Sequence, residues 1–104
     1  MKSRIAIIGT VMTVLMFLSA QAGAQSADEW VERGIEHFYA GEYETAIEFF
    51  TSAIETDPMH DVAYNGRGAS YKALGQYEKA ISDFSTSIDL NPEYVKPYYN
   101  RGDL

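Results

Sequence analysis

The side chains of this sequence that could carry out chemistry are two histidines and an excess of carboxylates. His37 and His60 could bind a metal ion or transfer protons if a second ligand stood at a suitable spacing. His37 has no such partner, and packing between helices is the favoured interpretation for it. His60 is followed by Asp61 in a segment with turn character, where a solvated or capping role is expected. An enzyme or metal-binding protein that uses these histidines is therefore the weaker alternative.

The carboxylates follow the spacing of helices rather than that of a site. Glu29, Glu32 and Glu36 form one acidic stripe, and Glu44 and Glu48 stand one turn apart. Such stripes are usually solvated helix faces. The sequence contains no calcium-binding loop, no glycine-rich phosphate loop and no serine in a nucleophile elbow. We therefore expect no catalysis, no metal ion and no cofactor.

Composition limits the classes of partner. The 104 residues include 15 Asp and Glu, eight Lys and Arg, and no cysteine. The lack of cysteine excludes disulfides, thiolate metal sites and a cysteine nucleophile. Without the segment 1–24, which holds two of the basic side chains, the formal charge is −9. A surface of this charge repels phosphates on average, so we expect no nucleic-acid partner and a preference for basic or neutral ones.

The segment 1–24 has the three parts of a secretory signal peptide. Lys2 and Arg4 precede an apolar run over residues 5–18, and small residues follow. The pattern predicts cleavage between Ala24 and Gln25, with a site two residues earlier as the alternative. An uncleaved membrane anchor is the competing interpretation, but the run is shorter than the ~20 residues that span a bilayer. We therefore expect an exported protein, periplasmic or secreted, with no membrane contact after cleavage.

An internal repeat dominates the rest of the sequence. The segment 27–60 aligns without a gap on the segment 61–94, and ten of its positions are identical there. In the first copy the shared positions are Arg33, Gly34, Gly41, Tyr43, Glu44, Ala46, Ile47, Phe50, Ile54 and Pro58. Because the match extends over the whole period, each copy is expected to form one structural unit.

Each copy has the apolar spacing of two helices that are joined by a short turn. A glycine in residues 40–42 and another in residues 74–76 permit the two turns. A proline then stops each second helix, since it lacks a backbone donor and restricts the residue before it. Glycine inside a helix is unfavourable, so Gly34 and Gly68 in the first helices predict close helix–helix approach, with Ala46 and Ala80 opposite them.

Taken together, these residues resemble the tetratricopeptide repeat (TPR), whose pattern begins with Trp, two residues and Leu-Gly and ends with Pro. The matching positions of the first copy are Trp30, Gly34, Ala46, Phe50 and Pro58. Those of the second copy are Tyr64, Gly68, Tyr71, Ala80, Phe84 and Pro92, with tyrosine at the tryptophan position. The departures are Arg33 and Arg67 at the leucine position and His37 at the tyrosine position. A third copy begins with Tyr98, Arg101 and Gly102, and the sequence stops at Leu104.

The resemblance implies an all-α fold of helix-turn-helix repeats, stacked as a short right-handed superhelix whose first helices line a concave face. After the signal peptide at 1–24, residues 25–26 form an N-terminal cap segment, in which Ser26 with Glu29 makes a capping-box pattern. Two full repeats follow, and residues 95–104 supply only the first helix of a third.

Two and a half repeats are few for an independent stack, since about three are usually needed. The final segment could cap the stack, two chains could pair end to end, or the sequence could begin a longer array. The last segment has the side chains of an internal repeat, which slightly favours a fragment that self-associates through its uncapped carboxyl-terminal end. An N-terminal fragment with no independent function is therefore the leading alternative.

For function, the resemblance implies a scaffold or adaptor that binds a protein partner, a peptide or a helix, in its concave groove. The groove-facing positions of the family correspond to Val31, Ile35, Phe38, Asn65, Ala69, Lys72, Lys96, Tyr99 and Asp103. Outside the repeat framework, the aromatic candidates for exposed contacts are Tyr39, Phe49, Tyr94 and Tyr99.

The chaperone-binding activity of some family members is not expected here. Members that grip a chaperone's acidic carboxyl-terminal tail use a lysine and an asparagine on the first helix, where this sequence has Val31 and Ile35. Asn65 and Lys96 could each still contact a peptide backbone or a carboxylate. The apolar first-copy groove instead predicts an apolar peptide or a neighbouring helix, and the competing interpretation is that its side chains pack locally.

Overall fold

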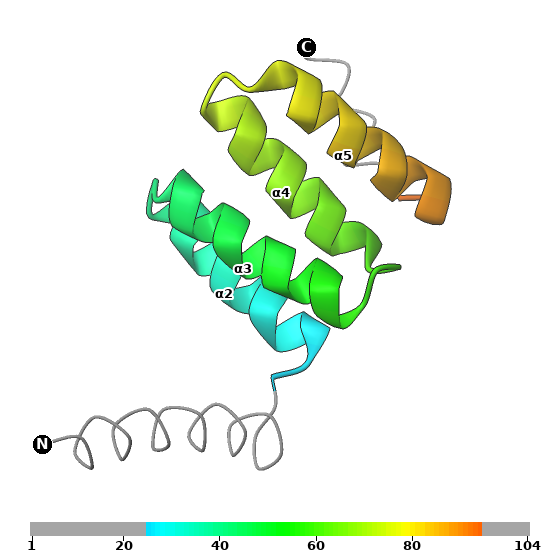
Figure 1. Cartoon of the computed structure of the whole chain (residues 1–104), viewed down its shortest axis with the longest axis horizontal. Coiled ribbons are helices and arrows are strands. Elements are labelled where there is room, and N and C mark those ends of the chain that lie inside the picture. The colour runs from blue at the N-terminus through cyan, green and yellow to red at the C-terminus, as the bar shows by residue number, and fades with distance from the viewer. Residues whose placement is uncertain (1–24, 95–104) are drawn as a thin grey trace, which may run out of the picture.

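The computed structural model describes residues 25–94, which form four α-helices and no strand (Figure 1). In chain order the helices are α2 (Ala27–Tyr39), α3 (Tyr43–Thr56), α4 (Asp61–Ala73) and α5 (Tyr77–Leu90). The predicted all-α fold of helix-turn-helix repeats is thereby confirmed. No helix within residues 25–94 is long and apolar enough to cross a membrane. The expected signal peptide and third repeat, at 1–24 and 95–104, lie outside the described residues.

Local sequence signals set the ends of the helices. The Oγ atom of Ser26 accepts a hydrogen bond from the backbone N–H of Glu29 at 3.2 Å, so the predicted cap of α2 is present. Gly41 and Gly75 have φ angles of +79° and +75°, in the left-handed region that favours glycine. Each therefore makes the turn between the two helices of its repeat. Both α3 and α5 end two residues before a proline.

The order of helix contacts gives the stack its curvature. Within each repeat the two helices pack together, α2 on α3 and α4 on α5, and α3 also packs on α4 (Figure 1). Across the repeats the first helices α2 and α4 touch, whereas no comparable contact joins α3 to α5 within residues 25–94. The first helices therefore converge and the second helices diverge. This places α2 and α4 on the concave side of the stack.

Inside each repeat the two helices meet at a glycine and a phenylalanine. A Cβ atom added at Gly34 would lie 2.7 Å from the ring of Phe50, and one at Gly68 would lie 2.6 Å from the ring of Phe84. Both rings are at most 1% exposed. The predicted close approach at these glycines is confirmed, because any side chain there would overlap an aromatic ring.

Phe50 also joins the first repeat to the second. A Cβ atom at Gly66 would lie 2.5 Å from the Phe50 ring, so this ring fills the space between glycines of α2 and α4. Ala46 and Ala80, which were expected opposite the helical glycines, are fully buried. The nearest side chain to each glycine is nevertheless the phenylalanine one turn further along the helix, since its ring reaches across the gap. In the second repeat a Cβ atom at Gly68 would also lie 3.2 Å from the backbone oxygen of Ala80, so the expected glycine–alanine pairing is present there, with the phenylalanine ring closer still.

Candidate peptide-binding surface

On the concave side, α2 presents one stripe of apolar side chains. Ile35 and Tyr39 are four residues apart and so project from one side of the helix. Ile35 is 38% exposed and Tyr39 is 77% exposed. Sequence reasoning placed Ile35 in the groove and named Tyr39 only as an exposed aromatic, although its spacing from Ile35 carried the signal.

Val31 and Phe38, the other two groove candidates of α2, both contact the core. Val31 is only 5% exposed and belongs to a buried cluster that includes Ala53 of α3 and Ala63 of α4. Phe38 is half-buried and packs against the same cluster. Because three helices close around Val31, its side chain does not face the groove as the sequence suggested. Burial supports the local-packing interpretation for Val31, whereas Phe38, half-buried like Ala69 and Lys72, stays a predicted groove residue.

The second repeat contributes α4 to the same side. Asn65 is buried, and its Nδ2 atom donates a hydrogen bond to Oη of Tyr94 at 3.2 Å. Burial raises the pKa of the Tyr94 hydroxyl, and the bond from Asn65 partly opposes that effect. Ala69 and Lys72 follow on α4 and are half-buried. Tyr94, named as an exposed aromatic, is thus held against Asn65, and a separation of 29 residues hid this contact from sequence patterns.

The remaining groove candidates, Lys96, Tyr99 and Asp103, lie outside the described residues and stay predictions. Within residues 25–94 the candidate surface therefore consists of Ile35, Phe38 and Tyr39 on α2, with Ala69 and Lys72 on α4. Apolar side chains dominate it. An arrangement of this kind offers apolar area that a partner could bury.

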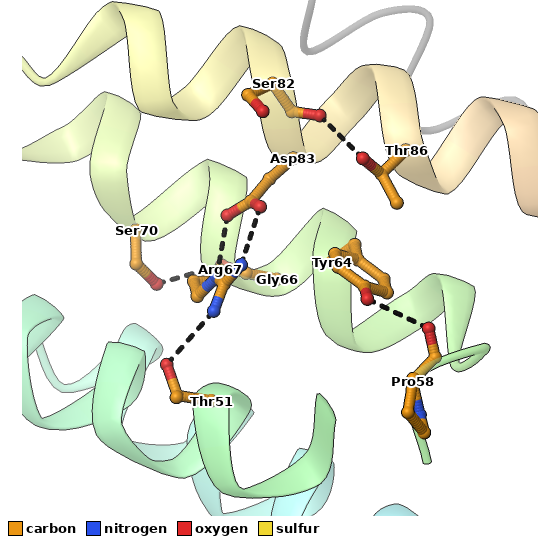
Figure 2. A network of polar contacts seen from close by, with 9 residues as sticks. All are labelled: Thr51, Pro58, Tyr64, Gly66, Arg67, Ser70, Ser82, Asp83 and Thr86. Carbon is orange, nitrogen blue, oxygen red and sulfur yellow. Dashed lines mark hydrogen bonds and ion pairs between the residues drawn. The ribbon is translucent and has the colours of Figure 1, made fainter. Parts of the chain in front are cut away.

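A buried ion pair ties α4 to its neighbours in the second repeat. Figure 2 shows the Arg67 guanidinium donating to both carboxylate oxygens of Asp83 on α5, at 2.8 and 2.9 Å. Its Nη1 atom also donates to Oγ1 of Thr51 on α3, at 3.3 Å. Hydrogen bonding to Asp83 raises the pKa of Arg67, which is charged in any case, so the pair acts structurally. One side chain thus links three helices.

Two tyrosines complete the environment of this guanidinium. The rings of Tyr64 and Tyr71 lie 5.8 and 5.9 Å from the central guanidinium carbon, within cation–π range. The sequence has Arg67 at a position that usually holds leucine and gives no sign of its partner. The separation of 16 residues between Arg67 and Asp83 follows no helical spacing, so only the packing of α4 on α5 brings the two together.

The corresponding part of the first repeat is a shallow hollow between α2 and α3. Phe49 stands where the second repeat has Asp83, and its ring stacks on His37 at 5.0 Å and lies 5.7 Å from Trp30. The hollow has a volume of about 340 Å³ and is lined by Glu29, Glu32, Arg33, Glu36, His37 and Phe49. We call it the amino-terminal hollow. Among residues 25–94 no carboxylate forms an ion pair with Arg33.

The two histidines have the structural roles that the sequence suggested. His37 packs on Phe49, and its Nδ1 atom lies 3.0 Å from Glu42. His60 caps α4 by accepting the Ala63 N–H on Nδ1 at 3.3 Å, and its Nε2 atom lies 2.6 Å from a carboxylate oxygen of Asp28. The part of the chain that the structure describes contains no group of three side chains suited to a metal ion.

The fold is that of an α-helical repeat protein built from helix-turn-helix units. Models of the tetratricopeptide repeat match residues 27–60 and 62–94. The chain belongs to the tetratricopeptide repeat family.

Solved structures of TPR domains share the fold. The second TPR of Spaghetti (RPAP3), bound to the HSP90 peptide SRMEEVD, superposes with a TM-score of 0.74 and 33% identity, over 82% of this chain and 79% of that one. The Sgt2 TPR domain from Aspergillus fumigatus gives 0.70 and 30%, over 73% and 50%. The TPR2AB domain of yeast Sti1, solved in an HSP90 complex, gives 0.73 over 95% and 39% at 23% identity, which supports the fold alone.

A curated relative shares a short segment of sequence. Hsp70-Hsp90 organizing protein 3 of Arabidopsis thaliana is 42% identical over 45 residues, which are 43% of this chain and 8% of that protein. The chain therefore spans only a small part of this relative.

Proposed function

We propose that this protein is a non-catalytic interaction module that binds a peptide or helix along the concave side of α2 and α4. The observation that carries the proposal is the pair of exposed apolar side chains on that side, Ile35 and Tyr39, one turn apart. An apolar residue of a partner would bury area against both, which is the driving force of helix-in-groove recognition. Similar TPR structures that hold an HSP90 peptide support this use of the fold.

The chemistry of the surface favours an apolar ligand over an acidic tail. Family members that bind acidic tails have a lysine and an asparagine at two positions of the first helix. At these positions this chain has Val31, which is buried, and Ile35, which is apolar. Asn65 on α4, which could contact a peptide carboxylate, already donates a hydrogen bond to Tyr94. The chain is also strongly acidic, so a carboxylate-rich peptide would approach against repulsion. We therefore propose that the ligand presents apolar side chains, and that the acidic-tail activity of some relatives does not extend to this chain.

A binding experiment with a matched control tests the concave surface. Peptides selected from a random library on the full chain should be rich in apolar residues, and SRMEEVD should bind at least about tenfold more weakly than they do. Ile35→Glu should then lower their affinity at least about tenfold, because a desolvated charge costs several kcal/mol. The control is Ile81→Glu on α5, since Ile81 is 41% exposed and Ile35 is 38% exposed. Equal losses for the two variants would refute the assignment.

We also propose, from the sequence pattern alone, that residues 1–24 direct export and are removed between Ala24 and Gln25. Amino-terminal sequencing of the protein from the periplasm or the medium should begin at Gln25. A full-length amino terminus in the membrane fraction would support the anchor instead. Self-association through the carboxyl-terminal end is a separate proposal, and a monomeric mass by light scattering at micromolar concentration would overturn it.

A further inference from the structure

The side of α2 that faces away from the second repeat corresponds to the side of α4 that packs on α3. The residues on these two corresponding sides differ sharply. On α4 this side is small and closely covered by α3, and it consists of Ala63, Gly66 and Ser70. On α2 the equivalent positions of the first copy are all exposed, and they are Glu29, Glu32 and Glu36. The small residues let α4 pack closely on α3. Carboxylates at the same positions of α2 could not pack on an apolar helix in this way, because they would lose their hydration. Among residues 25–94 nothing covers this side of α2, so it is a helix face suited to polar contacts.

Formal charge separates the two repeats as well. Residues 27–60 contain nine Asp and Glu and a single arginine, a charge of −8. Residues 61–94 contain five Asp and Glu and three Lys and Arg, a charge of −2. The field at the first repeat therefore attracts cationic partners. It also opposes a second copy of this chain, whose first repeat carries the same charge.

The amino-terminal hollow adds an aromatic surface to this charge. Half-buried Phe49 stacks on His37 and lies beside Trp30, so a partly accessible ring faces three carboxylates. Carboxylates beside an aromatic ring form the environment that the second repeat uses for its own guanidinium, with Asp83 and two tyrosines around Arg67. In the hollow one basic side chain, Arg33, stands against three glutamates. A further cation would therefore improve the local charge balance.

We propose that the amino-terminal hollow is a second docking surface, for a basic segment of a partner protein that lays a lysine or arginine side chain on Phe49 among Glu29, Glu32 and Glu36. This goes beyond the proposed function, because the hollow is lined by residues of α2 and α3, whereas the groove is formed by α2 and α4. The two surfaces together let one small domain hold an apolar segment and a basic one at the same time.

The intrinsic fluorescence of Trp30 provides a direct test with the full chain. Trp30 is the only tryptophan in the sequence and lies 5.7 Å from Phe49. The probe is a synthetic helical peptide with arginines on one face, and its matched control has glutamines at the same positions. The arginine peptide should produce a saturable change in Trp30 emission, and the glutamine peptide should produce none. No saturable change, or equal binding of both peptides, would overturn the proposal.

Matched charge variants then locate the site. Replacing Glu29, Glu32 and Glu36 together by glutamine should lower the affinity for the arginine peptide at least about tenfold, since three charge contacts are lost together. The control replaces Glu44, Glu48 and Glu55 of α3, all exposed and outside the hollow, and so removes the same charge from the same repeat. It should lower the affinity less than about threefold, as expected for screened surface charges. Equal losses would mean general electrostatic attraction only, and would overturn the site.

Two single variants separate this surface from the groove. Phe49→Leu keeps an apolar side chain but removes the aromatic face, and the affinity for the arginine peptide should fall about two- to fivefold, the effect of one exposed cation–π contact. Ile35→Glu should leave that affinity within about twofold, because the added charge lies outside the hollow. If Ile35→Glu abolishes binding, the peptide occupies the concave side and the inference fails. Circular dichroism of each variant verifies that the helices are retained.

Discussion

The two repeats share ten framework positions and yet treat the same side of the first helix in opposite ways. In the second repeat small residues let this side pack closely on α3. Arg67 also pairs with Asp83 and donates a hydrogen bond to Thr51 on α3. In the first repeat it is open, acidic and aromatic, with Phe49 in place of Asp83. The framework therefore fixes how the two helices of a repeat meet. The residues between framework positions decide whether a face packs on another repeat or remains available to a partner.

The largest effect is expected from breaking the buried pair of the second repeat. Asp83→Ala leaves the Arg67 guanidinium without its carboxylate, and loss of one partner of a buried pair costs about 3–5 kcal/mol. The control is Asp89→Ala, an exposed carboxylate on the same helix, which should change stability by less than about 0.5 kcal/mol. Urea unfolding followed by circular dichroism measures both. If the two variants lose a similarly small amount of stability, the Arg67–Asp83 ion pair does not stabilise the second repeat.

The next effect tests the contact that joins the repeats. Gly66→Ala would place a Cβ atom 2.5 Å from the Phe50 ring. Overpacking of this kind costs about 1–3 kcal/mol, against which alanine gains about 1 kcal/mol in helix propensity. The difference is a net destabilisation of up to about 2 kcal/mol.

A double-mutant cycle with Phe50→Leu sharpens this prediction. A smaller side chain at position 50 relieves the overlap, so the cost of Gly66→Ala should shrink in that background by at least about 0.5 kcal/mol. Additive costs in thermal or urea unfolding would show that the ring does not press on this glycine.

A smaller effect is expected when the first repeat receives the residue of the second. Phe49→Asp gives Arg33 a carboxylate at the position of Asp83, but it removes the ring that packs on Trp30 and His37. An exposed ion pair contributes about 0–1 kcal/mol, while each aromatic pair contributes about 0.5–1.5 kcal/mol beyond the area it buries. We therefore expect a net loss of about 1 kcal/mol in urea unfolding. A gain in stability would show that the ion pair of Arg33 with the new carboxylate contributes more than the lost contacts of the Phe49 ring.

The smallest effect concerns Tyr94 at the end of the second repeat. Its pKa is raised above the ordinary value of 10.0, chiefly by burial, so the folded state holds the phenolic proton more tightly than the unfolded state does. The resulting stability is fully present below pH 10 and is lost as the pH rises through the folded pKa. The melting temperature should therefore fall more steeply above pH 10 in the wild type than in Tyr94→Phe. Parallel curves for the two proteins would contradict this.

Sequence patterns were sufficient for the parts of the molecule that depend on near neighbours. The capping hydroxyl of Ser26, the positive φ of Gly41 and the capping role of His60 follow from residue types and short spacings, and all are observed. Groove membership was harder to predict. Val31 and Ile35 are one turn apart on the same helix, yet Val31 is buried and Ile35 is exposed. Val31 packs in a cluster with Ala53 of α3 and Ala63 of α4, and no local pattern encodes contacts between helices.

By itself the sequence determined the family, the helix boundaries and the charge difference between the repeats, because these depend on residue identity and on the period of the repeat. Tertiary structure decided the contacts between distant positions. It brought Asp83 to Arg67, Tyr94 to Asn65 and Gly66 to Phe50, and it left the hollow around Phe49 uncovered within residues 25–94. The physical reason is that these features depend on which helix faces meet, and faces meet through the packing of whole helices rather than through the spacing of residues along one of them.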